Sequence, residues 1–238
     1  MIKMSAIFFL FLLLPLSLLA QDFSDAVQTE TGSKDYTKTF ETAKIDAQQG
    51  DPKAQGDLGL LYEKGLGTPA DDKLAVYWLT KAAKKGDLNS ENNLGFMYFN
   101  GHGVAQDYAE AMRWFQKASD QGLASAQSNL GLMYGAGLGV PKDFAKALGF
   151  YKKAADQNDL DAQVNLGMMY SLGEGAPQDN KISYFWFYLA LQHSFAGEDE
   201  KNEVRDDIQW LEKHMKNEEI DQARLKAIHW RPVTSQSN

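Results

Sequence analysis

Apolar residues recur along the middle of this chain at intervals of three and four positions, which is the spacing of one face of an α-helix. The pattern is clearest from residue 58 to residue 67, which reads Leu-Gly-x-x-Tyr-x-x-Gly-x-Gly. It returns at residues 94, 130 and 166, so each copy starts 36 positions after the one before. A constant period of this size indicates stacked repeats, in which each unit covers the apolar face of the next.

Polar residues and glycines divide each repeat into two predicted helices. Asp51 predicts a helix start, because its side chain can accept hydrogen bonds from the free amides of the first turn. A second helix is expected from Asp71 or Asp72 to Lys85, closed by Gly86 in a left-handed conformation. Later repeats place Asp107, Asp143 and Asp179 at the start of the second helix and Gly122 and Asn158 at its end. The predicted fold is therefore all-α, an α/α superhelical solenoid of 36-residue helix-turn-helix repeats.

Four glycines lie inside the first helix of successive repeats, at Gly59, Gly95, Gly131 and Gly167. A glycine inside a helix costs about 1 kcal/mol relative to alanine, so its recurrence needs a reason. The sequence predicts that each one marks a close contact with a neighbouring helix, where a Cβ would not fit.

The repeat period sets the domain boundaries. We expect a signal peptide at 1–20, a flexible lead-in at 21–34, an N-terminal half-repeat cap at 35–50, repeats at 51–86, 87–122, 123–158 and 159–195, and a C-terminal helical cap and tail at 196–238.

In the fourth repeat the second helix is apolar nearly all round, from Ile182 to Leu189, so a further layer must cover it. The helices expected over 198–214 and 217–230 supply that layer.

The spacing and residue types resemble the Sel-one-like repeat family, which is related to the tetratricopeptide repeats. The third repeat meets that family's pattern at Ala126, Leu130, Gly131, Tyr134, Gly137, Gly139, Val140, Asp143, Ala147, Lys153, Ala154 and Ala155. Phe150 stands where the family and the other three repeats have Trp. The resemblance implies an α/α superhelix used for protein–protein interaction, often in bacterial envelope or secreted proteins.

Residues 1–20 combine Lys3 with an apolar run from Ala6 to Leu14, the pattern of a secretory signal peptide. This run is short for a membrane span, which needs about 20 apolar residues. We therefore expect export to the periplasm or the medium, with no stable membrane insertion after cleavage. Retention of the segment as an anchor is the alternative.

Composition narrows the classes of function. The formal charge of −8 argues against nucleic acid as a partner, and the absence of cysteine excludes thiol catalysis and cysteine-ligated zinc. The four histidines show no metal-ligand spacing, and no catalytic motif occurs, so we expect no catalytic residues, no cofactor and no metal. A non-enzymatic scaffold for a protein or peptide partner is favoured. The alternatives are an envelope enzyme, such as a cell-wall hydrolase, and a purely structural assembly module.

A candidate surface lies on the face of each first helix that points away from the apolar face. It combines carboxamides with an apolar strip, a mixture that suits an extended peptide, whose amides need both donors and acceptors. The candidate partner-binding residues are Asn89, Asn92, Asn93, Phe96, Asn129, Leu132, Asn165 and Met168. We expect them to line the concave face of the repeat array. The alternative is that these asparagines brace neighbouring helices.

Overall fold

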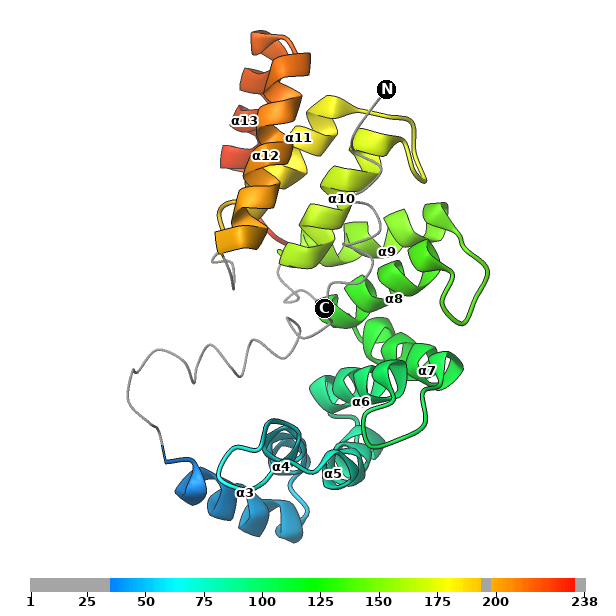
Figure 1. Cartoon of the computed structure of the whole chain (residues 1–238), viewed down its shortest axis with the longest axis vertical. Helices are drawn as coiled ribbons and strands as arrows, with labels where there is room; N and C mark the ends of the chain where they lie inside the picture. Colours follow the sequence, from blue (N-terminus) through cyan, green and yellow to red (C-terminus); the bar gives the residue numbers. More distant parts are fainter. Residues whose placement is uncertain (1–34, 194–197, 234–238) are drawn as a thin grey trace. The chain divides into compact units, whose positions relative to one another are not determined.

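The computed structural model describes residues 35–193 and 198–233, and in these two ranges the regular secondary structure is entirely α-helical (Figure 1). The helices are α3 (Thr37–Gln49), α4 (Pro52–Lys64), α5 (Asp72–Lys84), α6 (Leu88–Asn100), α7 (Tyr108–Asp120), α8 (Ala124–Ala136), α9 (Phe144–Asp156), α10 (Leu160–Leu172), α11 (Asn180–Ala190), α12 (Glu198–His214) and α13 (Asn217–His229). The all-α prediction is confirmed. The expected signal peptide and lead-in lie outside the described residues.

Aspartates cap the helices as the sequence predicts. The carboxylate of Asp51 accepts a hydrogen bond from the amide of Ala54 at 2.6 Å, and Asp71 accepts one from Leu74 at 3.0 Å. Asp87, Asp107, Asp143, Asp159 and Asp179 cap α6, α7, α9, α10 and α11 in the same way. These bonds satisfy backbone amides that have no partner within the helix, which is why the helix starts recur at fixed positions.

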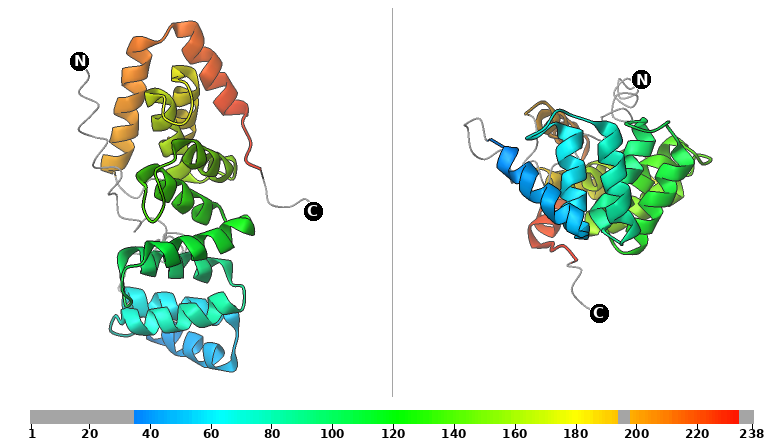
Figure 2. Two further views of the ribbon diagram at one scale, coloured as in Figure 1. Left: turned by 90° about the vertical axis from the view of Figure 1, so that its right-hand side faces the viewer. Right: turned by 90° about the horizontal axis from the view of Figure 1, so that it is seen from below.

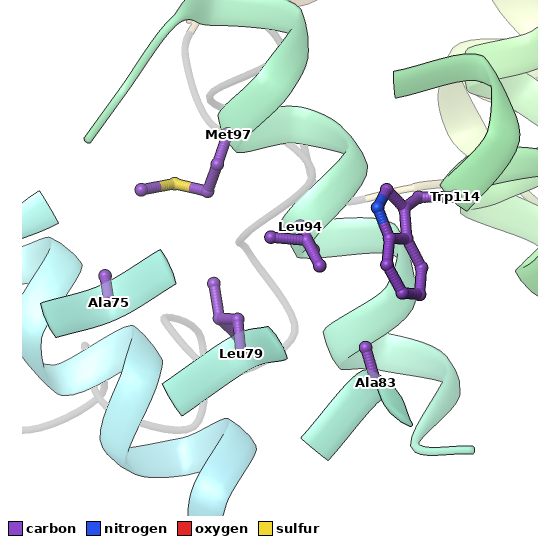
Figure 3. Packing of buried hydrophobic residues seen from close by; sticks show 6 residues of the cluster. All are labelled: Ala75, Leu79, Ala83, Leu94, Met97 and Trp114. Atoms are coloured by element: carbon purple, nitrogen blue, oxygen red, sulfur yellow. The ribbon is translucent and has the colours of Figure 1, made fainter. Parts of the chain in front are cut away.

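The chain divides into two compact units at residue 126, in the first turn of α8. In the first unit, each of the helices α3 to α6 packs against the next along the chain (Figure 2). A core cluster joins α5, α6 and α7, with Leu79, Leu94 and Met97 fully or almost fully buried and Trp114 7% exposed (Figure 3). This unit also contains α3, which packs on α4.

The helical glycines lie at the close contacts that the sequence predicts. In the first unit a Cβ on Gly59 would meet the Leu79 side chain at 2.7 Å, and one on Gly95 would meet the Phe115 ring at 2.7 Å. In the second unit, Gly131 has the same relation to Tyr151, at 2.8 Å. Real Cβ atoms do not approach other atoms so closely, so these positions require glycine.

In the second unit, α10 packs against α9 and α11, and α11 packs in turn against α12 and α13 (Figure 2). Helix α11 buries Tyr184, Phe185, Trp186 and Phe187, as expected for a helix covered on more than one side. Helix α12 contributes Val204, Ile208 and Leu211 to this packing. The helices expected over 198–214 and 217–230 correspond to α12 and α13, although α13 ends at His229, one residue before the expected end.

Candidate interaction surface

We call the first helices of the repeats (α4, α6, α8 and α10) the A helices and the second ones (α5, α7, α9 and α11) the B helices. The outer stripe of an A helix is its set of positions equivalent to Asn89, Asn93, Phe96 and Asn100 in α6. Three of these four side chains are half-buried and Asn89 is exposed. The Phe96 ring packs on the core cluster and meets the His102 ring edge-on, with 6.0 Å between centroids.

The structure contradicts the expected exposure of two candidate residues. Asn92 is only 4% exposed and Asn129 only 2% exposed, and both side chains make interactions within the protein. Position 92 lies next to the apolar face, so the packing of adjacent helices covers it. The expectation that these two asparagines are open to a partner is wrong, and the bracing alternative describes them better.

The other candidate residues remain at least partly accessible. Leu132 on α8 and Met168 on α10 are half-buried, as is Asn165. Asn165 donates from Nδ2 to the carbonyl of Asp161 at 2.8 Å, one turn earlier in the same helix. A carboxamide that uses one amide hydrogen in this way keeps an acceptor and a second donor for other partners. The stripe of α10 continues with Leu172, which is 37% exposed.

A buried polar row was missed by the sequence analysis, although its members are 36 residues apart. The row consists of Gln55, Glu91, Gln127 and Gln163, exposed by 4%, 0%, 6% and 0%. In the second unit, Gln157 on α9's C-terminal side donates to Gln127 at 2.9 Å. In the first unit, Gln55 donates to the carbonyl of Ala47 at 3.0 Å. These side chains bridge A helices to adjacent B helices, so they brace the repeats.

Glu91 is the one carboxylate in this row, and it is fully buried. Its Oε1 lies 2.7 Å from Nζ of Lys117, and Gln121 donates to its Oε2 at 3.3 Å. Lys117 also donates to the carbonyl of Ala83 at 3.0 Å and lies over the Trp114 ring. A buried charge needs such a partner because desolvation would otherwise make it costly.

Carboxylates also gather where α10 begins. Burial, and then the negative charges of Asp159 and Glu200, raises the pKa of Asp161 to about 7. On α12, burial and the charges of Glu203 and Asp206 raise the pKa of Asp207 to about 6. Among residues 35–193 and 198–233, however, no three acidic or histidine side chains are placed to hold a metal ion.

Tandem helix-turn-helix units with buried glycine contacts define the class of helical repeat proteins. Within this class the chain belongs to the Sel1 repeat family, whose sequence model matches residues 52–87, 88–123, 124–159 and 160–194. The matched repeats each begin one residue later than the boundaries expected from the sequence. Proteins built from this repeat are generally non-catalytic scaffolds for protein–protein interaction.

Solved structures support the same family. The chain is 30% identical to a protective antigen of uropathogenic Escherichia coli with an SLR fold, covering 90% of this chain and 43% of that one, with a TM-score of 0.74. It is 32% identical to a Sel1 repeat protein of Oxalobacter formigenes, covering 76% and 50%, with a TM-score of 0.64. The chain thus spans about half the length of these relatives or less. No curated protein matches it.

None of the helices in the described part of the chain has the length and apolar character that crossing a membrane requires. The segment on which the export prediction rests, residues 1–20, lies outside that part. Export and signal cleavage therefore stay predictions from the sequence.

Proposed function

We propose that this protein is a non-enzymatic scaffold that binds a protein or peptide through the outer stripes of the A helices α6, α8 and α10. The observation that carries the proposal is the uncharged stripe on α6, which comprises Asn89, Asn93, Phe96 and Asn100. These residues fall at intervals of four, three and four, so they follow one face of the helix. In a chain in which 24% of residues are charged, this face combines an aromatic ring with three carboxamides.

Such a stripe has the composition of an interface core. Interface cores are depleted in charged residues and enriched in aromatic ones, so burying this face costs little desolvation of charge. Carboxamides offer both a donor and an acceptor, which is what the main chain of an extended peptide requires. In the second unit, the stripe of α10 adds Asn165, Met168 and Leu172 beside Asp161, and the stripe of α8 adds Leu132 beside the buried Asn129. We propose that each unit contacts its own segment of the partner, and a continuous concave groove stays a prediction.

The test introduces charge on the stripe without changing its shape. The double change Asn89→Asp with Asn93→Asp adds two carboxylates to the proposed contact face of α6. The matched control is Gln48→Glu with Gln49→Glu, the same chemical change at two exposed positions of α3. Peptides selected from a random library against the parent chain provide the ligands, and titration calorimetry provides the affinities.

We expect the stripe variant to bind at least tenfold more weakly and the control to bind like the parent. Both variants should melt close to the parent, because the changed side chains are exposed or half-buried. Equal loss of affinity in both would indicate a general effect of negative charge. Unchanged affinity in the stripe variant would place the binding surface elsewhere.

The place of action is a further part of the proposal. The basic and apolar pattern of residues 1–20 supports export, and the proposed partner is then a protein of the periplasm or the medium, with no role for nucleic acid. Sequencing the N-terminus of the chain recovered from the periplasm, the medium and the membrane fraction tests this. A start at Gln21 supports cleavage, whereas a start at Met1 in the membrane fraction supports the anchor.

A further inference from the structure

Helix α13 presents an apolar strip to solvent, on the side opposite the one that packs on α11. Its buried side carries Ile220, Ala223 and Ala227. Leu225 and Ile228, which are 56% and 52% exposed, lie one turn apart on the other side. Among the described residues these are two of the most exposed large apolar side chains, and neither is needed to cover α11. Because the two side chains are adjacent on one face, a partner could bury them together.

The charges along this strip change sign from one end to the other. Glu218 and Asp221 precede the apolar pair at helical spacing and are exposed, whereas His229 and Arg231 follow it and are also exposed. A second copy of the same helix, placed antiparallel, would bring the basic end of each strip against the acidic end of the other. A parallel arrangement would oppose like charges. The strip is thus complementary to itself under a two-fold axis.

We propose that the protein associates with a second copy of itself through antiparallel pairing of α13 with the partner's α13. In this arrangement Leu225 of each copy packs against Ile228 of the partner subunit, so the two apolar pairs form one small core. Asp221 of each copy then lies near Arg231 of the partner subunit. In this pairing the apolar side chains of the two strips meet each other, and the acidic end of each strip meets the basic end of the other.

The surface area buried between the two α13 helices is small, so the affinity of the two copies for each other is low. One helix pair buries less than the roughly 800 Å² per partner of a standard stable interface. The dimer is therefore weak, with a dissociation constant on the order of 100 µM. Ion pairs at its edges are exposed, so moderate salt weakens the association further.

The first experiment is sedimentation equilibrium of the purified chain from about 10 to 500 µM, a range chosen to bracket a weak dimer. The disrupting variant is Leu225→Asp with Ile228→Asp, and the matched control is Ile45→Asp on α3, an apolar side chain that is 55% exposed. We expect the parent and the control to dimerise and the disrupting variant to stay monomeric. Circular dichroism shows that each variant is folded, which is expected because the changed residues are exposed.

A charge exchange tests the antiparallel orientation. Asp221→Arg alone should weaken the dimer at least threefold, because it places two cations together. Combining it with Arg231→Asp should restore the parental affinity. The proposal is overturned if the parent is monomeric up to 500 µM, which would mean that another partner or another part of the chain covers the strip. It is also overturned if Ile45→Asp disrupts the dimer equally, or if the charge exchange restores nothing.

Discussion

Within a repeat, the A and B helices meet where a glycine faces a large side chain, whereas α11, α12 and α13 are joined by larger apolar side chains and a polar trio. Gly131 against Tyr151 represents the first kind of contact. In the trio, the Tyr184 hydroxyl donates to Oε1 of Glu212 at 3.0 Å, and Nη2 of Arg224 donates to the hydroxyl at 2.9 Å. The glycine contact depends on shape, whereas the trio depends on matched polar partners.

The difference follows from what each region must contact. A repeat meets another copy of the same pattern, so one fixed pairing, a glycine with the residue 20 positions later, can be used four times. The terminal helices end the series and cover the apolar face of α11 with a sequence that has no such repeat. Polar partners there favour one arrangement, because the hydroxyl of the buried Tyr184 would be costly to leave unpaired.

The largest predicted effect concerns Glu91, where one repeat departs from the carboxamides of the others. Replacing Lys117 by Met keeps the packed side-chain stem but removes the cation beside a fully buried carboxylate. We expect a loss of about 3–5 kcal/mol in the free energy of unfolding, measured by urea denaturation.

The companion variant separates charge from packing. Adding Glu91→Gln to Lys117→Met should recover most of that loss, since glutamine occupies the equivalent positions 55, 127 and 163. If the double variant is as unstable as Lys117→Met alone, the lost stability came from packing against Trp114 and not from the buried charge.

The second prediction concerns the place where the repeats meet the terminal helices. There the carboxylate of Asp161 on α10 interacts with that of Glu200 on α12. The pKa of Asp161 is raised to about 7, so between about pH 4 and pH 7 the folded chain holds a proton that the unfolded chain releases. The free energy of unfolding should therefore fall as the pH rises through this range. Asp161→Asn should flatten the fall and stabilise the protein at pH 8 by on the order of 2 kcal/mol.

Urea denaturation from pH 5 to pH 8 measures this slope, with Asp46→Asn on the exposed face of α3 as the control. The control should keep the parental slope. Asp207, whose pKa is also raised, should leave a smaller residual slope in Asp161→Asn. An identical slope in the parent and Asp161→Asn would mean that Asp161 is charged in the folded protein at all these pH values.

The third prediction compares two glycines on adjacent helices of the third repeat. A Cβ on Gly131 would lie 2.8 Å from the buried Tyr151 ring, whereas a Cβ on Gly149 of α9 would have no described atom within 4 Å. Gly131→Ala should cost about 1–3 kcal/mol by overpacking. Gly149→Ala should instead stabilise by up to about 1 kcal/mol, because alanine favours the helix. Thermal melts of the same sign for both would show that the helix contact does not depend on shape.

Local rules made most of the fold predictable. Asp107 and Asp143 cap their helices, and Gly131 meets a neighbouring helix, because each depends on residues within one 36-residue pattern. The exposure of Asn129 was not predictable in this way. Helical periodicity gives the direction in which a side chain points, but it does not show how far the neighbouring helices extend over that side chain.

Pairings between residues that are distant in the sequence were also missed, because helical periodicity does not show which side chains of two helices meet. The contact between Glu91 and Lys117 joins two helices, and its only sequence signal was a polar residue repeated every 36 positions beside the apolar face. The trio of Tyr184, Glu212 and Arg224 has no repeated counterpart, so only the three-dimensional structure brings it together.

The smallest predicted effect tests that trio. Tyr184→Phe removes a hydroxyl that makes two hydrogen bonds but leaves the ring in place, and Arg224 and Glu212 still pair at 3.3 Å. The expected cost is therefore only about 1 kcal/mol. Because the bonds join α11 to α12 and α13, amide hydrogen exchange should accelerate in those helices and stay unchanged in α9 and α10.

The control is Tyr188→Phe, which should change neither region. The ring of Tyr188 stacks on that of Tyr184 with 6.0 Å between centroids. Faster exchange throughout α9 to α13 in Tyr184→Phe would contradict the comparison, since the repeats and the terminal helices would then depend on the same contacts.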